Sequence, residues 1–228
     1  MNLIRREEYF AFVQRHPEMF VNPPGGFTIF LKEDEIQGVE DSMAHRLEAE
    51  GMPAAWAQVG IVFLDQYGMI LRDAVLFPDG SPGTYIRFVS EGDGVGTVIL
   101  PRYGEQILLL RHFRHATRTW HLEIPRGFGK PGFSSEENAR RELEEEIGAK
   151  ALQFVSLGSV YPDTGMDAAV IELFYAQIEV YGPLDTMEGI TEVLAVSVAD
   201  FEAMIRESTI TDGFTIAAYA RAKLRGLL

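Results

Sequence analysis

Apolar residues recur at helical spacing along the first part of the chain. The stretches EEYFAFVQRHPEMF and EDSMAHRLEAEG both place apolar side chains three and four residues apart, and the sequence NPPGG interrupts the chain between them. Gly51 closes the second stretch, as a glycine commonly does at the end of a helix. We therefore expect residues 1–52 to form a helical extension, in which we find no catalytic signature.

From Trp56 onward, short apolar runs alternate with turn sequences. AQVGIVFLD, MILRDAVLF and TYIRFVS each have the length and composition of a strand, and FPDGSPG is a typical turn sequence. This pattern predicts a small antiparallel sheet in residues 53–95. The next stretch, GVGTVILPRYGEQILLLRHF, predicts a strand, a turn and a second strand, and ILLL is apolar enough for a strand buried on both faces.

The rest of the chain interleaves strands with helices. We expect strands in FVSLGSVY, AVIELFYAQIEV and ITEVLAVSV, helices in an acidic segment after Ser134, in ADFEAMIRES and in DGFTIAAYARAKL, and a loop at WHLEIPRG. This order predicts an α/β (α+β) domain over residues 96–228, in which a mixed β-sheet lies between helices.

The composition indicates a globular chain and disfavours two classes of partner. The formal net charge of −14 opposes binding to nucleic acid and to anionic lipid. The absence of cysteine excludes disulfides, thiolate nucleophiles and cysteine-ligated zinc. No apolar run approaches the ~18 residues of a membrane-spanning helix, and charged residues interrupt the start of the chain. We therefore expect a soluble, cytoplasmic protein without a nucleic-acid or membrane partner.

The stretch GFGKPGFSSEENARRELEEEIGAK crowds its glutamates into about three helical turns. Ser134 followed by Glu137 is a capping-box signature, and Gly148 is a natural terminator, so we expect a helix over about residues 135–147. The apolar stripe that should face the core consists of Ala139, Leu143 and Ile147.

Three glutamates lie directly beside this stripe, namely Glu142, Glu145 and Glu146. Carboxylates three and four residues apart repel each other, and at the edge of a core each is also partly desolvated. The cluster has two interpretations: a solvated acidic face, or a platform for a hard dication such as Mg²⁺, which prefers oxygen ligands. The helix by itself does not decide between them.

The wider segment resembles the signature box of the Nudix hydrolases. The residues that match this box at its fixed spacing are Gly127, Arg141, Glu142, Leu143, Glu145, Glu146 and Gly148. The resemblance implies the Nudix fold and the hydrolysis of a nucleoside diphosphate linked to a second moiety, with Mg²⁺ or Mn²⁺ as the cofactor. In such a displacement the metal has two roles, which are to activate a water molecule and to neutralise the charge of the pyrophosphate.

One position departs from the box, which carries a glutamate where this chain has Phe133. In the family that glutamate mostly braces the box arginine, so the resemblance implies that Arg141 takes another partner, either Glu137 or Glu145. Glu136 stands four residues before Arg140 and could form a similar helical pair with it. The departure also supports a second hypothesis, a Nudix-fold nucleotide-binding or regulatory protein with weak or no turnover.

Sequence outside the box resembles the ADP-ribose pyrophosphatase subgroup over about residues 55–226. The similar stretches are LLLRHFRHATRTWHLEIPRG, VYPDTG and STITDGFTIAAYARAKL. The subgroup implies a small-molecule substrate, with ADP-ribose hydrolysed to AMP and ribose 5-phosphate, and a homodimer. A GDP-sugar, a dinucleoside polyphosphate or a coenzyme stays open as the substrate, because no base-contacting residue is legible.

The resemblance also implies roles for individual residues. The substrate-binding residues would be Arg111, Arg114, Glu123 and Pro162. The metal ligands would be the main-chain carbonyl of Arg126 with Glu142, Glu145 and Glu146. The catalytic residues would be Glu145, Glu146 and, on a loop near Glu192, Glu188. Without the resemblance, the two arginines could equally be solvated at a strand end, and Glu188 could be a surface carboxylate.

Overall fold

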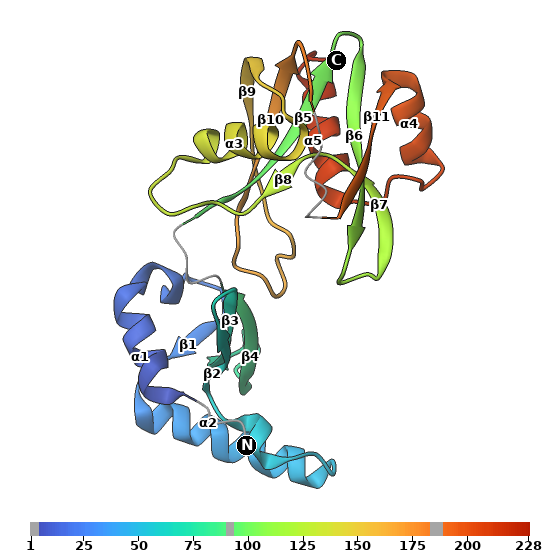
Figure 1. Cartoon of the computed structure of the whole chain (residues 1–228). Helices are drawn as coiled ribbons and strands as arrows, with labels where there is room; N and C mark the ends of the chain where they lie inside the picture. The colour runs from blue at the N-terminus through green and yellow to red at the C-terminus, as the bar shows by residue number, and fades with distance from the viewer. Residues whose placement is uncertain (1–4, 90–93, 183–188) are drawn as a thin grey trace. The chain divides into compact units, whose positions relative to one another are not determined.

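The computed structural model describes residues 5–89, 94–182 and 189–228 (Figure 1). The chain divides into two compact units. The first comprises residues 1–91 with 163–168, and the second comprises residues 92–162 with 169–228. The division expected near residue 52 has no counterpart, because the helices and strands on either side of it share one hydrophobic core.

The first unit packs two helices against a small antiparallel sheet. The helices are α1 (Arg6–Arg15) and α2 (Glu33–Ala49). The strands are β1 (Thr28–Phe30), β2 (Gly60–Asp65), β3 (Gly68–Leu76) and β4 (Pro82–Val89). β3 pairs with the other three strands, and the short β1 lies in a stretch where we expected no strand. The core includes Tyr9, Phe12, Ile36 and Leu71.

Residues 163–168, far along the chain, belong to this first unit. The Phe88 amide donates to the Met166 carbonyl at 2.7 Å, and the Ala168 amide donates to the Phe88 carbonyl at 3.0 Å. The Tyr85 hydroxyl donates to the Gly165 carbonyl at 2.6 Å. The segment therefore extends the β4 edge of the small sheet.

The second unit contains a mixed sheet, which has seven strands within the described ranges. The strands are β5 (Gly96–Tyr103), β6 (Gln106–Arg114), β7 (Thr119–Glu123), β8 (Arg126–Gly127), β9 (Ala151–Val160), β10 (Ile171–Ile178) and β11 (Ile190–Ser197). The main order is β11-β6-β5-β10-β9, with β5 and β10 parallel and the other pairs antiparallel. The loop expected at WHLEIPRG was wrong, since β7 and β8 lie there and pair with β6 and β5.

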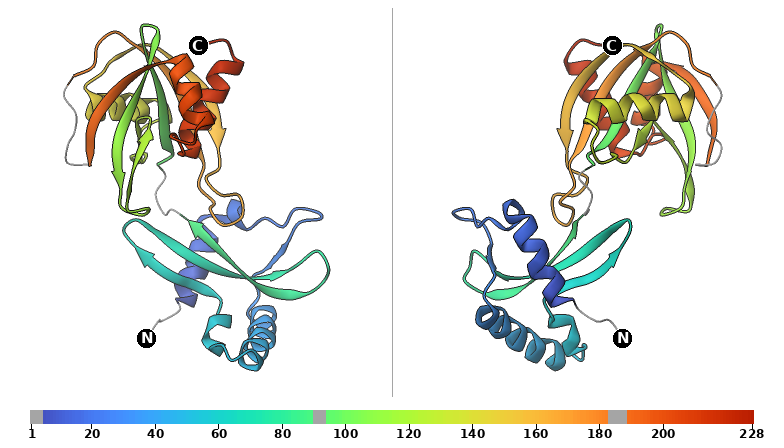
Figure 2. Two further views of the ribbon diagram at one scale, coloured as in Figure 1. Left: turned by 90° about the vertical axis from the view of Figure 1, so that its right-hand side faces the viewer. Right: turned by 60° about the vertical axis from the view of Figure 1, so that its left-hand side comes forward.

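Helices cover both faces of this mixed sheet, as the sequence predicted. α3 (Ser135–Ile147) packs on one face against residues such as Ile99, Leu108 and Phe174. α4 (Val198–Arg206) and α5 (Gly213–Leu224) cover the other face, as the two views in Figure 2 show. The two layers fix the acidic helix against the strands that carry the other candidate residues.

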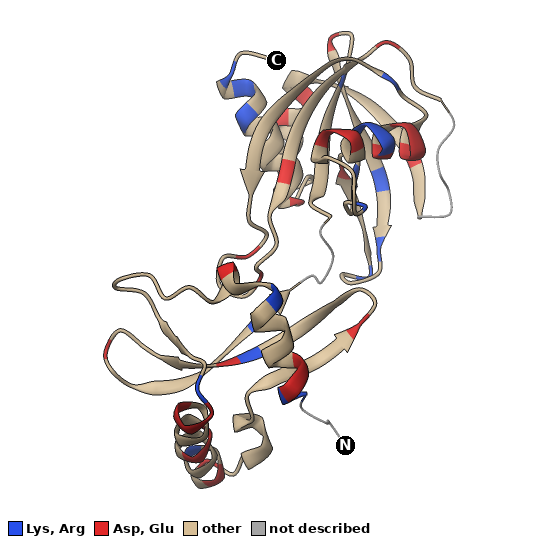
Figure 3. Ribbon diagram, turned by 90° about the vertical axis from the view of Figure 1, so that its left-hand side faces the viewer, with Lys and Arg blue, Asp and Glu red and all other residues tan. Residues whose placement is uncertain are grey.

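Charged residues are spread over both units, with carboxylates prominent on α2 and α3 (Figure 3). In the part of the chain that the structure describes, no helix is long and apolar enough to cross a membrane.

Candidate active site

Helix α3 begins and ends as its sequence predicted. The Ser134 amide donates to the Glu137 carboxylate at 2.8 Å, and the Glu137 amide donates to the Ser134 hydroxyl at 3.2 Å, which completes the capping box. Gly148 ends the helix in the left-handed conformation, with a φ of 62°. The predicted stripe of Ala139, Leu143 and Ile147 is fully buried.

Two of the three candidate glutamates are buried beside that stripe. Glu142 is 7% exposed and Glu146 is 2% exposed, whereas Glu145 is half-exposed. The Glu142 carboxylate lies against Gly127, where an added Cβ would come within 2.1 Å of its carboxyl carbon. The Glu146 carboxylate accepts a hydrogen bond from the Arg126 amide at 3.1 Å. Gly127 is therefore required because a side chain there would displace Glu142.

The loop before α3 is held by close backbone packing and by one buried side chain. A Cβ on Gly129 would meet the backbone of Gly94 and Val95 at 2.5 Å, so the two segments touch main chain to main chain. On the helix side, the Lys130 amide donates to the side-chain carbonyl of the fully buried Asn138 at 3.0 Å. Sequence inspection missed this role of Asn138.

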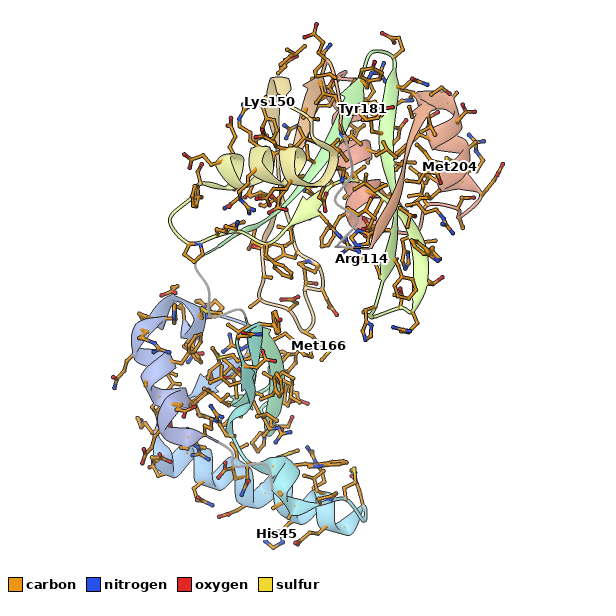
Figure 4. The ribbon with its side chains drawn as sticks, in the orientation of Figure 1. His45, Arg114, Lys150, Met166, Tyr181 and Met204 are labelled. Atoms are coloured by element: carbon orange, nitrogen blue, oxygen red, sulfur yellow. The ribbon has the colours of Figure 1, made fainter. Side chains whose placement is uncertain are left out.

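The cavity at this loop has a volume of about 600 Å³, which lies within the range of about 300–1,000 Å³ that is common for small-ligand sites. It is bordered by β5, β8, the loop and α3. Its charged lining residues are Arg114, Arg126, Lys130, Arg141, Glu142 and Glu145. Arg114, the last residue of β6, is labelled in Figure 4. Carboxylates and guanidinium groups thus face the same space.

Arg141 pairs with two of the candidate glutamates. Its Nη1 lies 2.5 Å from Glu145 Oε2, and its Nη2 lies 2.5 Å from Glu142 Oε1. The expected pairing with Glu145 is confirmed, whereas the pairing with Glu137 was wrong because Glu137 closes the capping box. The expected pair of Glu136 and Arg140 is confirmed, with Arg140 Nη2 2.7 Å from Glu136 Oε1.

Glu123 is a buried carboxylate, 1% exposed, surrounded by three basic side chains. His112 Nδ1 lies 2.9 Å from one carboxylate oxygen, which also contacts Arg114, and Arg126 Nη2 lies 3.1 Å from the other. Burial alone would raise the pKa of Glu123, but the His112 and Arg114 contacts, aided by Arg126, lower it below its usual value. Glu123 therefore stays charged and holds two arginines at the cavity wall.

Arg126 also ties this network to helix α5. Its Nη1 lies 3.0 Å from Asp212 Oδ1, and Asp212 caps α5 by accepting the Thr215 amide at 2.9 Å. The Ile124 amide donates to the Thr215 hydroxyl at 3.2 Å. The sequence predicts a role only for the main-chain carbonyl of Arg126, not for its side chain. The sequence signal for Asp212 was its position as an N-cap, three residues before a threonine.

Two of the remaining predicted site residues, Arg111 and Pro162, do not line this cavity. The Arg111 guanidinium lies over the Trp120 ring at 4.3 Å, and among the described residues Arg111 does not line the cavity. Pro162 is exposed beyond the end of β9 and also does not line it. Glu188 lies outside the described residues. The structure therefore groups Arg114, Arg126, Glu142 and Glu145, with Glu146 directly behind.

The carboxylates of α3 suit a hard dication, although Arg141 pairs with two of them, Glu142 and Glu145. Across residues 5–89, 94–182 and 189–228, no set of three or more acidic or imidazole side chains is arranged as a ready metal site. However, Glu142, Glu145 and Glu146 offer oxygen ligands from one helix, and Gly127 leaves space for the Glu142 carboxylate. Mg²⁺ and Mn²⁺ prefer oxygen donors of this kind.

A mixed sheet between helices, with a glutamate-rich helix over a glycine loop, defines the class of this protein. The NUDIX domain family model matches residues 91–209, so the chain belongs to the Nudix family and is a hydrolase. It is 28% identical over 127 residues to an ADP-ribose pyrophosphatase of Bacillus subtilis (strain 168), covering 54% of this chain and 68% of that protein. Its fold is similar to the crystal structure of an ADP compounds hydrolase, with a TM-score of 0.64 and 20% identity, covering 75% of this chain and 93% of that one.

Proposed function

We propose that this protein hydrolyses the pyrophosphate bond of a nucleoside diphosphate sugar in a Mg²⁺- or Mn²⁺-dependent reaction. ADP-ribose is the first substrate to test, with AMP and ribose 5-phosphate as the products. The observation that carries the proposal is the pair of buried carboxylates, Glu142 and Glu146, beside a cavity that Arg114 also lines. The similarity to an ADP-ribose pyrophosphatase supports the choice of substrate.

The metal would be held by Glu142, Glu145, Glu146 and the carbonyl oxygen of Arg126. When bound, such an ion lowers the pKa of water and neutralises charge on the phosphates. The burial of Glu142 and Glu146 gives these carboxylates fixed positions before substrate arrives, which limits the reorganisation that the reaction requires.

Basic side chains on the cavity wall bind the substrate. Arg114 and Lys130 line the cavity, and a guanidinium or ammonium group there donates hydrogen bonds to phosphate oxygens. Glu123 keeps Arg114 oriented, because the buried carboxylate contacts its guanidinium. Glu123 thus acts on the substrate through Arg114 and needs no contact of its own.

Hydrolysis forms one bond between water oxygen and phosphorus and breaks the bond from that phosphorus to the bridging oxygen. The bridging oxygen leaves with the second phosphate. The proton released by water passes to a carboxylate, for which Glu146, Glu145 and Glu188 are the candidates. Glu145 is half-exposed at the cavity and can exchange this proton with solvent.

A substrate panel tests this proposal. The full chain is incubated with Mg²⁺ or Mn²⁺ and with ADP-ribose, a GDP-sugar, a dinucleoside polyphosphate or a nucleotide coenzyme, and the phosphate-containing products are separated. We expect AMP and ribose 5-phosphate from ADP-ribose. Hydrolysis of none of these compounds at millimolar metal would contradict the proposal and would favour a nucleotide-binding protein without turnover.

A further inference from the structure

Phe128 is a large apolar side chain that lies in water at the edge of the candidate active site. Its ring is 89% exposed, and it lines the 600 Å³ cavity together with the charged groups. Phe133, on the same loop, is 54% exposed, and among the described residues it does not line the cavity. A single exposed apolar residue is common on protein surfaces, so the position of Phe128 needs evidence beyond its exposure.

The backbone on both sides of Phe128 is fixed. Gly127 lies against the Glu142 carboxylate, and Gly129 lies against the backbone of Gly94 and Val95, each at a distance that leaves no room for a side chain. The next residue, Lys130, is bonded to a buried side chain through its amide. The Phe128 ring is therefore presented at the cavity from a held loop, and the loop cannot easily turn it toward a protein core.

The neighbours of Phe128 would bring a phosphate-bearing compound beside the ring. Arg114 and Lys130 line the same cavity and suit phosphate oxygens, and the carboxylates of α3 are the candidate metal ligands. In a nucleoside diphosphate sugar, the pyrophosphate joins the ribose of the nucleoside at one end and the second sugar at the other, and the nucleobase lies beyond the nucleoside ribose. An aromatic side chain next to the phosphate-binding groups is placed to cover one of these rings.

We propose that Phe128 is a specificity-determining residue whose side chain packs against a ring of the substrate in this cavity, either in its nucleoside half or in its second sugar. This inference rests on the proposed function. Stacking on an aromatic side chain gains affinity through dispersion and through removal of apolar surface from water, and it adds no charge requirement. It therefore selects ring-bearing pyrophosphates over inorganic ones.

Equilibrium binding to the full chain tests the inference without requiring turnover. The probes are the ADP-ribose analogue with a methylene bridge between its phosphates, AMP, ribose 5-phosphate and inorganic pyrophosphate, titrated by calorimetry. The proteins are the native chain, Phe128→Ala, Phe128→Tyr and Phe133→Ala. Phe128→Ala should weaken the analogue by about tenfold or more, while Phe128→Tyr and Phe133→Ala keep the native affinity.

The smaller probes distinguish the two halves of the substrate and control for damage to the loop. Loss of affinity for AMP alone assigns the nucleoside half of the substrate to Phe128, and loss for ribose 5-phosphate alone assigns the second sugar. The inference is overturned if Phe128→Ala binds the analogue as tightly as the native chain does. It is also overturned if Phe128→Ala loses as much affinity for inorganic pyrophosphate as for the analogue. If the native chain hydrolyses ADP-ribose but Phe128→Ala binds normally, the inference alone fails; if the native chain binds no ring-bearing probe, the proposed function fails with it.

Discussion

Glu146 combines a negative charge with almost complete burial, so at the residue scale it gives the sharpest test of the proposed chemistry. Glu146→Gln removes the charge but keeps the shape and the oxygen that accepts the Arg126 amide. We expect kcat to fall by about two orders of magnitude or more, with the melting temperature nearly unchanged. Steady-state kinetics and thermal unfolding measure the two quantities.

Glu144 provides the matched control for this substitution. It lies on the same helix, two residues away, but it is exposed and its carboxylate is 3.6 Å from Lys150. Glu144→Gln should keep kcat close to native. If Glu146→Gln also stays within about threefold of native, Glu146 does not serve the reaction.

Tyr9 donates a hydrogen bond to the buried ion pair of Asp73 and Arg87 in the first unit. Its hydroxyl donates to Asp73 at 2.7 Å, and Arg87 Nε lies 2.6 Å from the other oxygen of this buried carboxylate. Tyr9→Phe removes one donor and should destabilise the unit by about 1–3 kcal/mol. In a Trp120→Phe background, Trp56 is the sole tryptophan of the chain, so its fluorescence during urea unfolding reports this unit.

The pH dependence of this effect has a definite sign. Burial, followed by the charge and hydrogen bond of Asp73, raises the pKa of Tyr9 well above its usual value. A raised folded-state pKa gives stability that is complete below the unfolded pKa of about 10 and decreases as the pH rises above it. The difference between native and Tyr9→Phe should therefore shrink above about pH 10. Tyr67→Phe, at an exposed tyrosine, should change stability little at any pH.

At the scale of elements, the sequence predicted α3 to the residue because its signals are local. The capping box, the apolar stripe and the terminal glycine all lie within the helix or directly beside it. The same local patterns predicted the helices α4 and α5 and most strands. They failed for β1, β7 and β8, which are short and depend on pairing with distant strands.

The site could be predicted only in part for the same reason. Glu142, Glu145 and Glu146 share one helix, so their spacing places them together. The contact between Arg126 and Asp212 joins residues 86 positions apart, and the buried contacts of Glu123 join the three strands β6, β7 and β8. Helical or strand periodicity carries no information on such pairs. The sequence treats Arg111 and Arg114 as equivalent, yet of these two residues of β6 only Arg114 lines the cavity, whereas Arg111 lies over the Trp120 ring.

The pairing of Arg141 leads to a prediction about metal requirement. Its guanidinium contacts Glu142 and Glu145, two of the proposed ligands, so a metal ion must compete with it for these carboxylates. Phe133→Glu adds a carboxylate just before the helix that can draw Arg141 away. We expect half-activation to shift to Mg²⁺ concentrations several-fold lower, since about 1.4 kcal/mol corresponds to a tenfold change.

Metal binding can be measured apart from turnover by titrating the same proteins with Mn²⁺ and recording free Mn²⁺ by electron paramagnetic resonance. Phe133→Gln, which has nearly the same shape as the glutamate variant but no charge, is the control and should behave as native. Equal Mn²⁺ affinity of native and Phe133→Glu would show that Arg141 does not limit metal binding. Activity confined to Phe133→Glu would mean that the natural protein binds nucleotides without hydrolysing them.

At the scale of the whole molecule, the first unit depends on a segment from the middle of the second. Residues 163–168 add to the edge of β4 through main-chain hydrogen bonds. No local pattern in YPDTGMDAA indicates such pairing, so the sequence could not predict this composition of the unit. The segment follows directly on Pro162, which lies just beyond the end of β9 and does not line the cavity.

The final prediction concerns self-association through the first unit. The first unit exposes the aromatic side chains of Phe63, Tyr67 and Phe88, and we predict that the chain forms a homodimer through them. Apolar groups of this kind favour association, whereas the net charge of −14 opposes it unless salt screens the repulsion. Sedimentation equilibrium at micromolar concentration and about 0.15 M salt should therefore give about 51 kDa, twice the chain mass of 25.5 kDa.

Tyr67→Lys should shift the protein toward monomer, while Tyr161→Lys, at an exposed residue of the second unit, should not. A native protein that sediments only as a monomer under these conditions would rule out the dimer.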